Sequence, residues 1–188
     1  MKHRCAWVSD KEIYIKYHDE EWGVPVRDDK KMFEFLLLET FQAGLSWITI
    51  LNKRENFREA FDQFDYKKIA LYNENKFEEL ISNPGIIRNK AKISSAINNA
   101  QQYQFVQKEF GSFCNYLWSF VNDEVIQNNF SLNSDIPAST ELSDRISKDL
   151  KKRGFKFIGS TTIYAHLQAT GLVNDHLTTC FRYHTCPK

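Results

Sequence analysis

The stretch Leu150-Lys151-Lys152-Arg153-Gly154-Phe155-Lys156-Phe157-Ile158-Gly159-Ser160-Thr161-Thr162-Ile163 decides the fold of this 188-residue chain. An amphipathic segment from Leu142 to Arg153 leads into it, and Gly154 is suited to end that segment as a left-handed cap. A second helix is predicted from about Thr161 to Thr170, closed by Gly171. The backbone N–H groups of such a turn, and of the helix start behind it, can bind a phosphate. A helical hairpin over about 142–170 is therefore expected.

Helical periodicity continues through the rest of the chain. Ser9 to Glu12 reads as a capping box for a helix that reaches about His18, and Asp28 or Asp29 can cap the next helix. Further helices are predicted from Ser46 onward and over 65–71, 77–81, 90–103 and 113–121, with a polar, irregular segment at 122–139. No strand with period-2 alternation is found. We expect an all-α fold in which residues 1–188 form one unit of two lobes around a cleft.

Composition bounds the protein's location and partners. The longest purely aliphatic run is Leu36–Leu38, and the first residues lack the apolar stretch of a signal peptide, so we expect a cytoplasmic protein without a membrane span. The net charge of +1 neither favours nor excludes a nucleic-acid partner. Basic residues gather at Arg88, Lys90 and Lys92 and again at Lys151, Lys152, Arg153 and Lys156. These clusters are either solvated helix ends or part of a DNA-facing surface.

Four cysteines in a cytoplasmic protein indicate metal binding or buried thiols before disulfides. His176 and Cys180 are spaced i, i+4, which on a helix places both side chains on one face. Cys5 and His18 can supply a second pair, and two Cys with two His form a closed tetrahedral set suited to structural zinc. The alternative is a set of unconnected residues, and His3, His184 and Cys186 compete as ligands. Cys114 is predicted to be a core thiol.

A carboxylate lies among aromatic residues in the first quarter of the chain. Glu39 follows the apolar run Phe35–Leu38, so it either faces an interior cleft or is an ordinary exposed helical glutamate. The aromatic residues are Trp7, Tyr14, Tyr17, Trp22 and Trp47. Aromatic crowding by itself usually indicates a core. Together with a carboxylate, it forms a box for a flat cationic ligand through stacking and cation–π attraction.

The motifs together resemble one family, DNA-3-methyladenine glycosylase I of the helix-hairpin-helix superfamily. The resemblance covers nearly the whole chain, in order and at family spacing. It is carried by Arg4–Trp7, Tyr14–Pro25, Leu38-Glu39, Gln42–Trp47, Gly85–Arg88, Leu117–Phe120, Arg153–Phe157 and Gly171–His176. In this superfamily an Asp after the hairpin is catalytic, and here Asn174 takes that position.

The resemblance implies a role for each matching residue. Cys5, His18, His176 and Cys180 match a zinc clip that joins the two ends of the chain. Glu39, our candidate catalytic group, and Tyr17 match the groups that hydrogen-bond the excised base, and Trp47 matches the ring that stacks on it. The pocket wall is matched by Trp7, Trp22 and Tyr14, with fine contacts around Ala165 and His166 left open. Gln42 and Leu45 match residues that fill the gap left by a flipped nucleotide. We also expect Lys156 and the turn that includes Gly159, Ser160 and Thr161 to contact backbone phosphates of the DNA.

The expected activity is excision of 3-methyladenine from double-stranded DNA by a monomer, leaving an abasic site. The methylated purine carries positive charge, so it leaves without protonation, and Asn174 need not deprotonate water. The hairpin carries no lysine at Gly159-Ser160-Thr161, which argues against a lyase that works through a Schiff base. A zinc hydrolase is disfavoured because four protein ligands leave no open position for water. A non-catalytic DNA-binding module remains the alternative.

Overall fold

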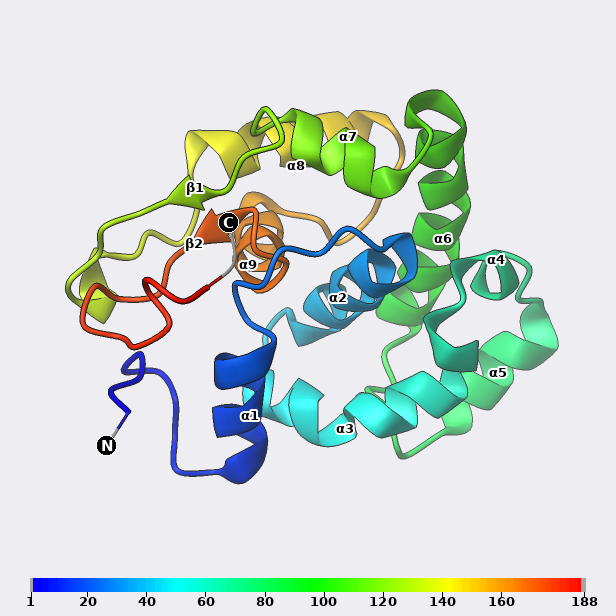
Figure 1. Cartoon of the computed structure of the whole chain (residues 1–188). Coiled ribbons are helices and arrows are strands. Elements are labelled where there is room, and N and C mark those ends of the chain that lie inside the picture. Colours follow the sequence, from blue (N-terminus) through cyan, green and yellow to red (C-terminus); the bar gives the residue numbers. More distant parts are fainter. Residues whose placement is uncertain (1, 187–188) are drawn as a thin grey trace.

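The computed structural model describes residues 2–186 and is mostly helical, as predicted (Figure 1). The α-helices are α1 (Glu12–Glu20), α2 (Asp29–Gln42), α3 (Trp47–Ala60), α4 (Tyr66–Ile69), α5 (Glu74–Ser82), α6 (Lys90–Phe110), α7 (Phe113–Ser119), α8 (Glu141–Lys152) and α9 (Ser160–Ala169). Two 3-10 turns, η1 (Asp62–Phe64) and η2 (Asn133–Asp135), and two short strands, β1 (Ile126–Gln127) and β2 (Val173–Asn174), complete the list.

Helix α2 is the centre of the fold. Every residue from Met32 to Phe41 is buried, because α3, α6, α7 and α9 pack around the helix (Figure 1). A helix buried all round reads as a nearly continuous apolar run rather than as an amphipathic stripe. Glu34 and Glu39 are the two carboxylates within this run. Burial of a carboxylate is unfavourable unless hydrogen bonds or a nearby cation compensate it.

Helix starts were predicted with mixed success. The Asp28 carboxylate accepts a hydrogen bond from the Lys31 N–H, so Asp28 caps α2. The capping box predicted at Ser9 is wrong: α1 begins at Glu12, and its N-cap Lys11 makes no side-chain capping bond. Ser9 lies too early in the chain, and its hydroxyl instead accepts from the Lys11 N–H at 3.4 Å. A loop turn therefore took the place of the expected cap.

The absence of strands was also predicted wrongly, although the exception is small. Strands β1 and β2 pair in parallel over two residues each, with Ile126 opposite Val173 and Gln127 opposite Asn174. Two residues are too few to show a period-2 pattern. The pairing fixes the polar 122–139 segment beside the chain that leads to His176.

The α8–α9 pair begins and ends within one or two residues of the predicted bounds. Gly154 has φ +90°, which suits its predicted place at the end of α8. Side chains from two helices hold the turn: Asn99 of α6 bonds both the N–H and the C=O of Lys156, at 2.8 and 2.9 Å. The Ser147 hydroxyl of α8 donates to the Ile158 carbonyl at 2.7 Å. These hydrogen bonds from α6 and α8 hold the backbone of the turn in place.

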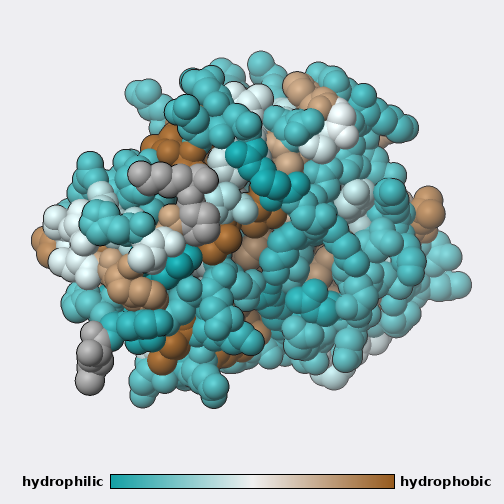
Figure 2. Space-filling model, in the orientation of Figure 1, coloured by the Kyte–Doolittle hydropathy of each residue, from teal (hydrophilic) through white to brown (hydrophobic). Residues whose placement is uncertain are grey.

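The N-terminal segment before α1 and the loop that follows β2 lie on the same side of the molecule (Figure 1). The Phe181 N–H donates to the His3 carbonyl at 2.9 Å, so the N-terminal segment and the C-terminal loop are in direct contact. Figure 2 shows a largely hydrophilic face in which apolar residues form only small patches. None of the helices within residues 2–186 combines the length and the apolar character needed to cross a membrane.

Candidate functional site

A cavity of about 290 Å³ lies where α1, α2, α3 and α9 approach one another. It is lined by Trp7, Tyr14, Tyr17, Trp22, Glu39, Gln42, Trp47, Asn133, Ile136, Ala165 and Gln168. All five aromatic residues predicted to form a box contribute to its wall, together with the predicted carboxylate. The size and lining suit a flat heteroaromatic ligand of a few rings.

Glu39 faces this cavity from the last turn of α2. Its side chain is only 4% exposed, and one carboxylate oxygen, Oε2, is fully buried with no hydrogen-bond partner in the described structure. Burial raises the pKa of Glu39 to about 8, since the ionised form loses its hydration and gains no local cation. A positively charged ligand in the cavity would compensate the carboxylate charge directly.

The aromatic rings form a continuous wall. Trp7 lies between Tyr14 and Trp22, with ring centroids 5.2 and 5.0 Å apart and edge-on geometry. Tyr17 and Trp47 face each other at 5.4 Å from α1 and α3. Burial, with a further contribution from the Glu39 charge, raises the pKa of Tyr17 well above its ordinary value, so its hydroxyl stays a hydrogen-bond donor. The cavity therefore offers stacking surfaces and one neutral phenol beside the carboxylate.

Three cavity residues carried no signal in the sequence. Asn133 and Ile136 come from the irregular 131–136 segment, and Gln168 comes from α9. A polar segment without periodicity gives no indication of what it covers, so only the fold could place the first two. Gln168 reads as an ordinary polar residue of an amphipathic helix.

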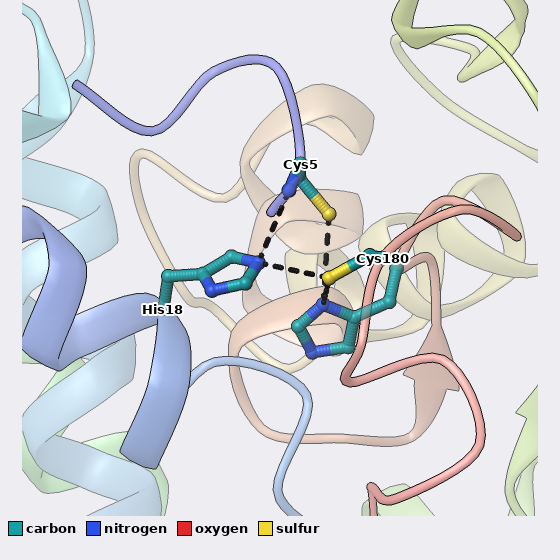
Figure 3. Close-up of side chains that lie close together, drawn as sticks. Cys5, His18 and Cys180 are labelled. Carbon is teal, nitrogen blue, oxygen red and sulfur yellow. Dashed lines mark hydrogen bonds between the residues drawn. The ribbon is translucent and has the colours of Figure 1, made fainter. Parts of the chain in front are cut away.

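A second group of side chains lies behind the aromatic wall. Cys5, His18, His176 and Cys180 are buried, and one ligand atom from each lies within 4.8 Å of all the others. Figure 3 shows Cys5, His18 and Cys180 pointing toward one another from the N-terminal segment, α1 and the C-terminal loop. The Cys180 sulfur lies 3.4 Å from His18 Nε2 and 3.6 Å from His176 Nδ1. These four residues can hold a metal ion.

The outward-facing ring nitrogens support that assignment. His18 Nδ1 bonds the Asp19 carboxylate at 2.8 Å, and Arg4 holds that carboxylate with two further bonds of 2.7 and 2.8 Å. His176 Nε2 lies 3.1 Å from the Trp22 carbonyl. A ring nitrogen that donates outward leaves the inward nitrogen free to bind a metal, which is the usual arrangement around metal-bound histidines.

His176 and Cys180 do not lie on a helix, although their i, i+4 spacing would suit one. The segment after β2 is a loop, and a tight turn brings the Cys180 N–H to 2.7 Å from the Leu177 carbonyl. This turn places both side chains together as a helix would have done. Of the competing ligands, His3 and His184 are exposed, and Cys186 donates its S–H to the Gly23 carbonyl at 2.7 Å. Cys114 is buried, as expected of a core thiol.

The metal-ligand group and the cavity share a wall. Trp7 contacts the His18 ring at 5.3 Å between centroids, and Trp22 contacts the His176 ring at 4.6 Å. Both tryptophans also line the cavity. The position of the aromatic wall therefore depends on the four residues that can hold a metal ion.

Asn174 lies away from the cavity lining. Its side-chain oxygen accepts from the His176 N–H at 3.1 Å, and its NH₂ group donates to Gln127 Oε1 at 2.9 Å and the Tyr183 carbonyl at 3.2 Å. All its polar side-chain atoms are engaged in holding the loops around His176. Its observed contacts are structural.

The exposed end of α2 leads to residues predicted to contact DNA. Gln42 lines the cavity rim, and Leu45, after Gly44 at φ +80°, is 39% exposed. Lys92, predicted as part of a basic surface cluster, is buried instead: its ammonium donates to the carbonyls of Phe41 and Ala43 at 2.9 and 2.6 Å. These bonds satisfy carbonyls that the end of α2 leaves without helical partners.

The basic cluster near the turn between α8 and α9 is also partly engaged within the protein. The Arg153 guanidinium pairs with Glu109 and Asp149, at 2.6 and 2.7 Å, so it is not a free charge. Lys156 and Thr161 are exposed, whereas Gly159 and Ser160 are half-buried at the start of α9. The turn between α8 and α9 therefore presents an exposed lysine a few residues before a helix N-terminus.

Comparison with known proteins agrees with this geometry. A family model described as methyladenine glycosylase matches residues 7–183. The DNA-3-methyladenine glycosylase 1 of Escherichia coli (strain K12) is 51% identical over 180 residues, which cover 96% of each chain. Among solved structures, a crystal structure of a 3-methyladenine DNA glycosylase I is 50% identical, with a TM-score of 0.93 over 95% of this chain and 98% of the other. The Staphylococcus aureus enzyme, in a structure on the basis of 3-methyladenine recognition, is 37% identical, with a TM-score of 0.93 over 98% and 97% of the two chains. The chain belongs to the methyladenine glycosylase family.

Proposed function

We propose that this chain is a monofunctional DNA glycosylase that flips 3-methyladenine out of double-stranded DNA and hydrolyses its N-glycosyl bond, leaving an abasic site. The observation that carries the proposal is the buried Glu39 carboxylate, which faces an aromatic cavity and has no cation of its own among the described residues. The curated relatives bear the name of this activity, and one solved relative is described in terms of 3-methyladenine recognition.

Recognition of the base depends on charge. With a pKa of about 8, Glu39 is mostly protonated in the empty cavity at neutral pH, and a cationic purine displaces that proton. A hydrogen bond to the ionised carboxylate stabilises the bound base by about 1.5–3 kcal/mol. Stacking on Trp47 adds about 1–3 kcal/mol, by analogy with bases stacked on aromatic side chains in single-strand binding. Neutral adenine obtains only the stacking, so it does not offset the cost of flipping.

Release of the base needs little acid–base help. A methylated purine is already a cationic leaving group, so protonation is not required. Asn174 cannot act as a base, and its hydrogen bonds hold it in the loops around His176. In this mechanism Glu39 and Tyr17 read and hold the purine while Trp7, Trp22 and Tyr14 enclose it.

The DNA backbone binds at the hairpin. The first N–H groups of α9, at Ser160 and Thr161, have no partner within the helix and are available to a phosphate after Gly159. Lys156 supplies a positive charge beside them. The hairpin acts here as the helix-hairpin-helix of the superfamily. Leu45 and Gln42 enter the duplex and fill the space left by the flipped nucleotide.

The metal ion held by Cys5, His18, His176 and Cys180 is zinc. Two sulfur and two nitrogen ligands form the closed tetrahedral set that structural zinc prefers, with no position left for a reacting water. The ion stabilises the contact between the ends of the chain and the tryptophan wall. We further propose that residues 1–188 form one unit of two lobes, which acts as a monomer in the cytoplasm.

The decisive experiment is incubation of the protein with alkylated duplex DNA, followed by chromatography of the released bases. The expected product is free 3-methyladenine and an intact abasic strand. Binding to DNA without release of any base would favour a non-catalytic DNA-binding module. A covalent adduct trapped by borohydride would contradict the assignment as a monofunctional enzyme.

A further inference from the structure

Asp175, next to the proposed zinc ligand His176, is a buried carboxylate that the mechanism above does not use. It is 1% exposed and accepts three hydrogen bonds: from Asn128 Nδ2 at 2.6 Å, from the Tyr164 hydroxyl at 2.5 Å and from Gln168 Nε2 at 2.7 Å. No lysine or arginine in the described part of the chain pairs with it. Its surroundings therefore consist of neutral donors, one of which belongs to the cavity wall.

That wall residue is Gln168 of α9. The Gln168 amide turns its NH₂ group toward Asp175, where Nε2 donates to the carboxylate at 2.7 Å. Its carbonyl oxygen, Oε1, then points away from Asp175 and has no protein donor among residues 2–186. An amide that is free to rotate offers either a donor or an acceptor to a ligand, but this amide is restricted to offering an acceptor.

We propose that Gln168 is a further specificity-determining residue, which reads the exocyclic amino group of the base, and that Asp175 positions it for this task. The inference rests on the proposed function and deepens it. An acceptor held in place favours a purine with an amino group at position 6 and disfavours one with an oxygen there, because two facing acceptors leave both without a hydrogen bond. Glu39 reads the charge of the base, and Gln168 reads this substituent.

The test compares the affinity of the free bases 3-methyladenine and 3-methylhypoxanthine, measured by quenching of tryptophan fluorescence. The second base carries an oxygen in place of the 6-amino group. The wild-type protein should prefer 3-methyladenine. Gln168→Met removes the acceptor while keeping the length of the side chain, and it should reduce the preference about five- to tenfold, the worth of one neutral hydrogen bond.

A matched variant separates this effect from a general loss of structure. Tyr164→Phe removes a different donor from Asp175 and leaves the Gln168 bond in place, so it should retain the preference. Metal content and circular dichroism of each variant establish that the fold is intact.

The outcomes distinguish the inference from the function on which it rests. If the wild-type protein binds 3-methyladenine and Gln168→Met keeps the full preference, the inference is overturned and the proposed function stands. The same holds if Tyr164→Phe loses the preference as Gln168→Met does, because the loss would then follow from disturbing the group around Asp175 and not from the missing acceptor. A wild-type protein that binds neither base would overturn the proposed function itself.

Discussion

Substitution of Glu39 by Gln should stabilise the protein, and the gain should grow with pH. The buried carboxylic acid has a pKa of about 8 in the folded protein, against an ordinary value of 4.5. Above pH 4.5 the unfolded chain therefore loses this proton while the folded protein keeps it. Glu39 contributes stability that is complete below its unfolded pKa and is lost as the pH rises through its folded pKa. The amide of the variant does not titrate, so the variant lacks this dependence on pH.

The size of the effect follows from the two pKa values. One pKa unit corresponds to about 1.4 kcal/mol, so the free energy of unfolding of the wild-type protein should fall by about 3.5 kcal/mol more than that of Glu39→Gln between about pH 5 and pH 8. The slope should level off above about pH 9, where Glu39 is ionised in both states. All other titrating groups are common to the two proteins and cancel in the comparison.

Urea unfolding followed by tryptophan fluorescence at a series of pH values measures this difference. The matched control is Glu59→Gln on α3, where the side chain is exposed to water and the curves of variant and wild type should stay parallel. Parallel curves for Glu39→Gln as well would refute the reasoning. Glu39 would then be as well solvated as a surface carboxylate, and the charge-reading mechanism would lose its basis.

Five other outcomes are expected from the same structure. In base release, Glu39→Gln should lower the preference for 3-methyladenine over adenine by about 10- to 100-fold, the equivalent of one charged hydrogen bond; an unchanged preference would show that the carboxylate does not read the lesion. Metal analysis should find one zinc per wild-type chain and much less in Cys5→Ser, and full occupancy in that variant would remove Cys5 from the ligand set. Leu45→Ala should slow excision from duplex DNA without changing the affinity for the free base. Lys156→Ala should lower the slope of the salt dependence of DNA binding by about one unit. If either variant weakened free-base binding as much as excision, the DNA-facing surface would be misplaced. Lys92→Met leaves two carbonyls at the end of α2 without a donor, so it should lower the free energy of unfolding by about 1–3 kcal/mol. It should also slow excision from duplex DNA more than it weakens free-base binding. Equal effects on excision and on free-base binding would argue against a role of Lys92 in holding the Leu45 loop.

Much of the fold and the site was predictable because the relevant signals are local. The helical periods located α8 and α9, and the residues carrying the family resemblance included the carboxylate and the aromatic wall that the structure brings together. The signals failed where the outcome depends on distant partners. Lys92 was read as a surface charge because nothing in its own helix shows that the end of α2 lies against it. His176 and Cys180 meet through a turn, which the i, i+4 spacing does not distinguish from a helix.

The contact between the two ends of the chain also sets the order in which the protein can mature during synthesis. Cys5 and His176 are 171 residues apart in the sequence, and His18 and Cys180 are 162 apart. Until His176 is made, Trp22 lacks the histidine ring that packs against it, although α2 can already pack with α3, α6 and α7. A nascent chain can therefore form much of its hydrophobic core before the wall of the base-binding cavity is complete.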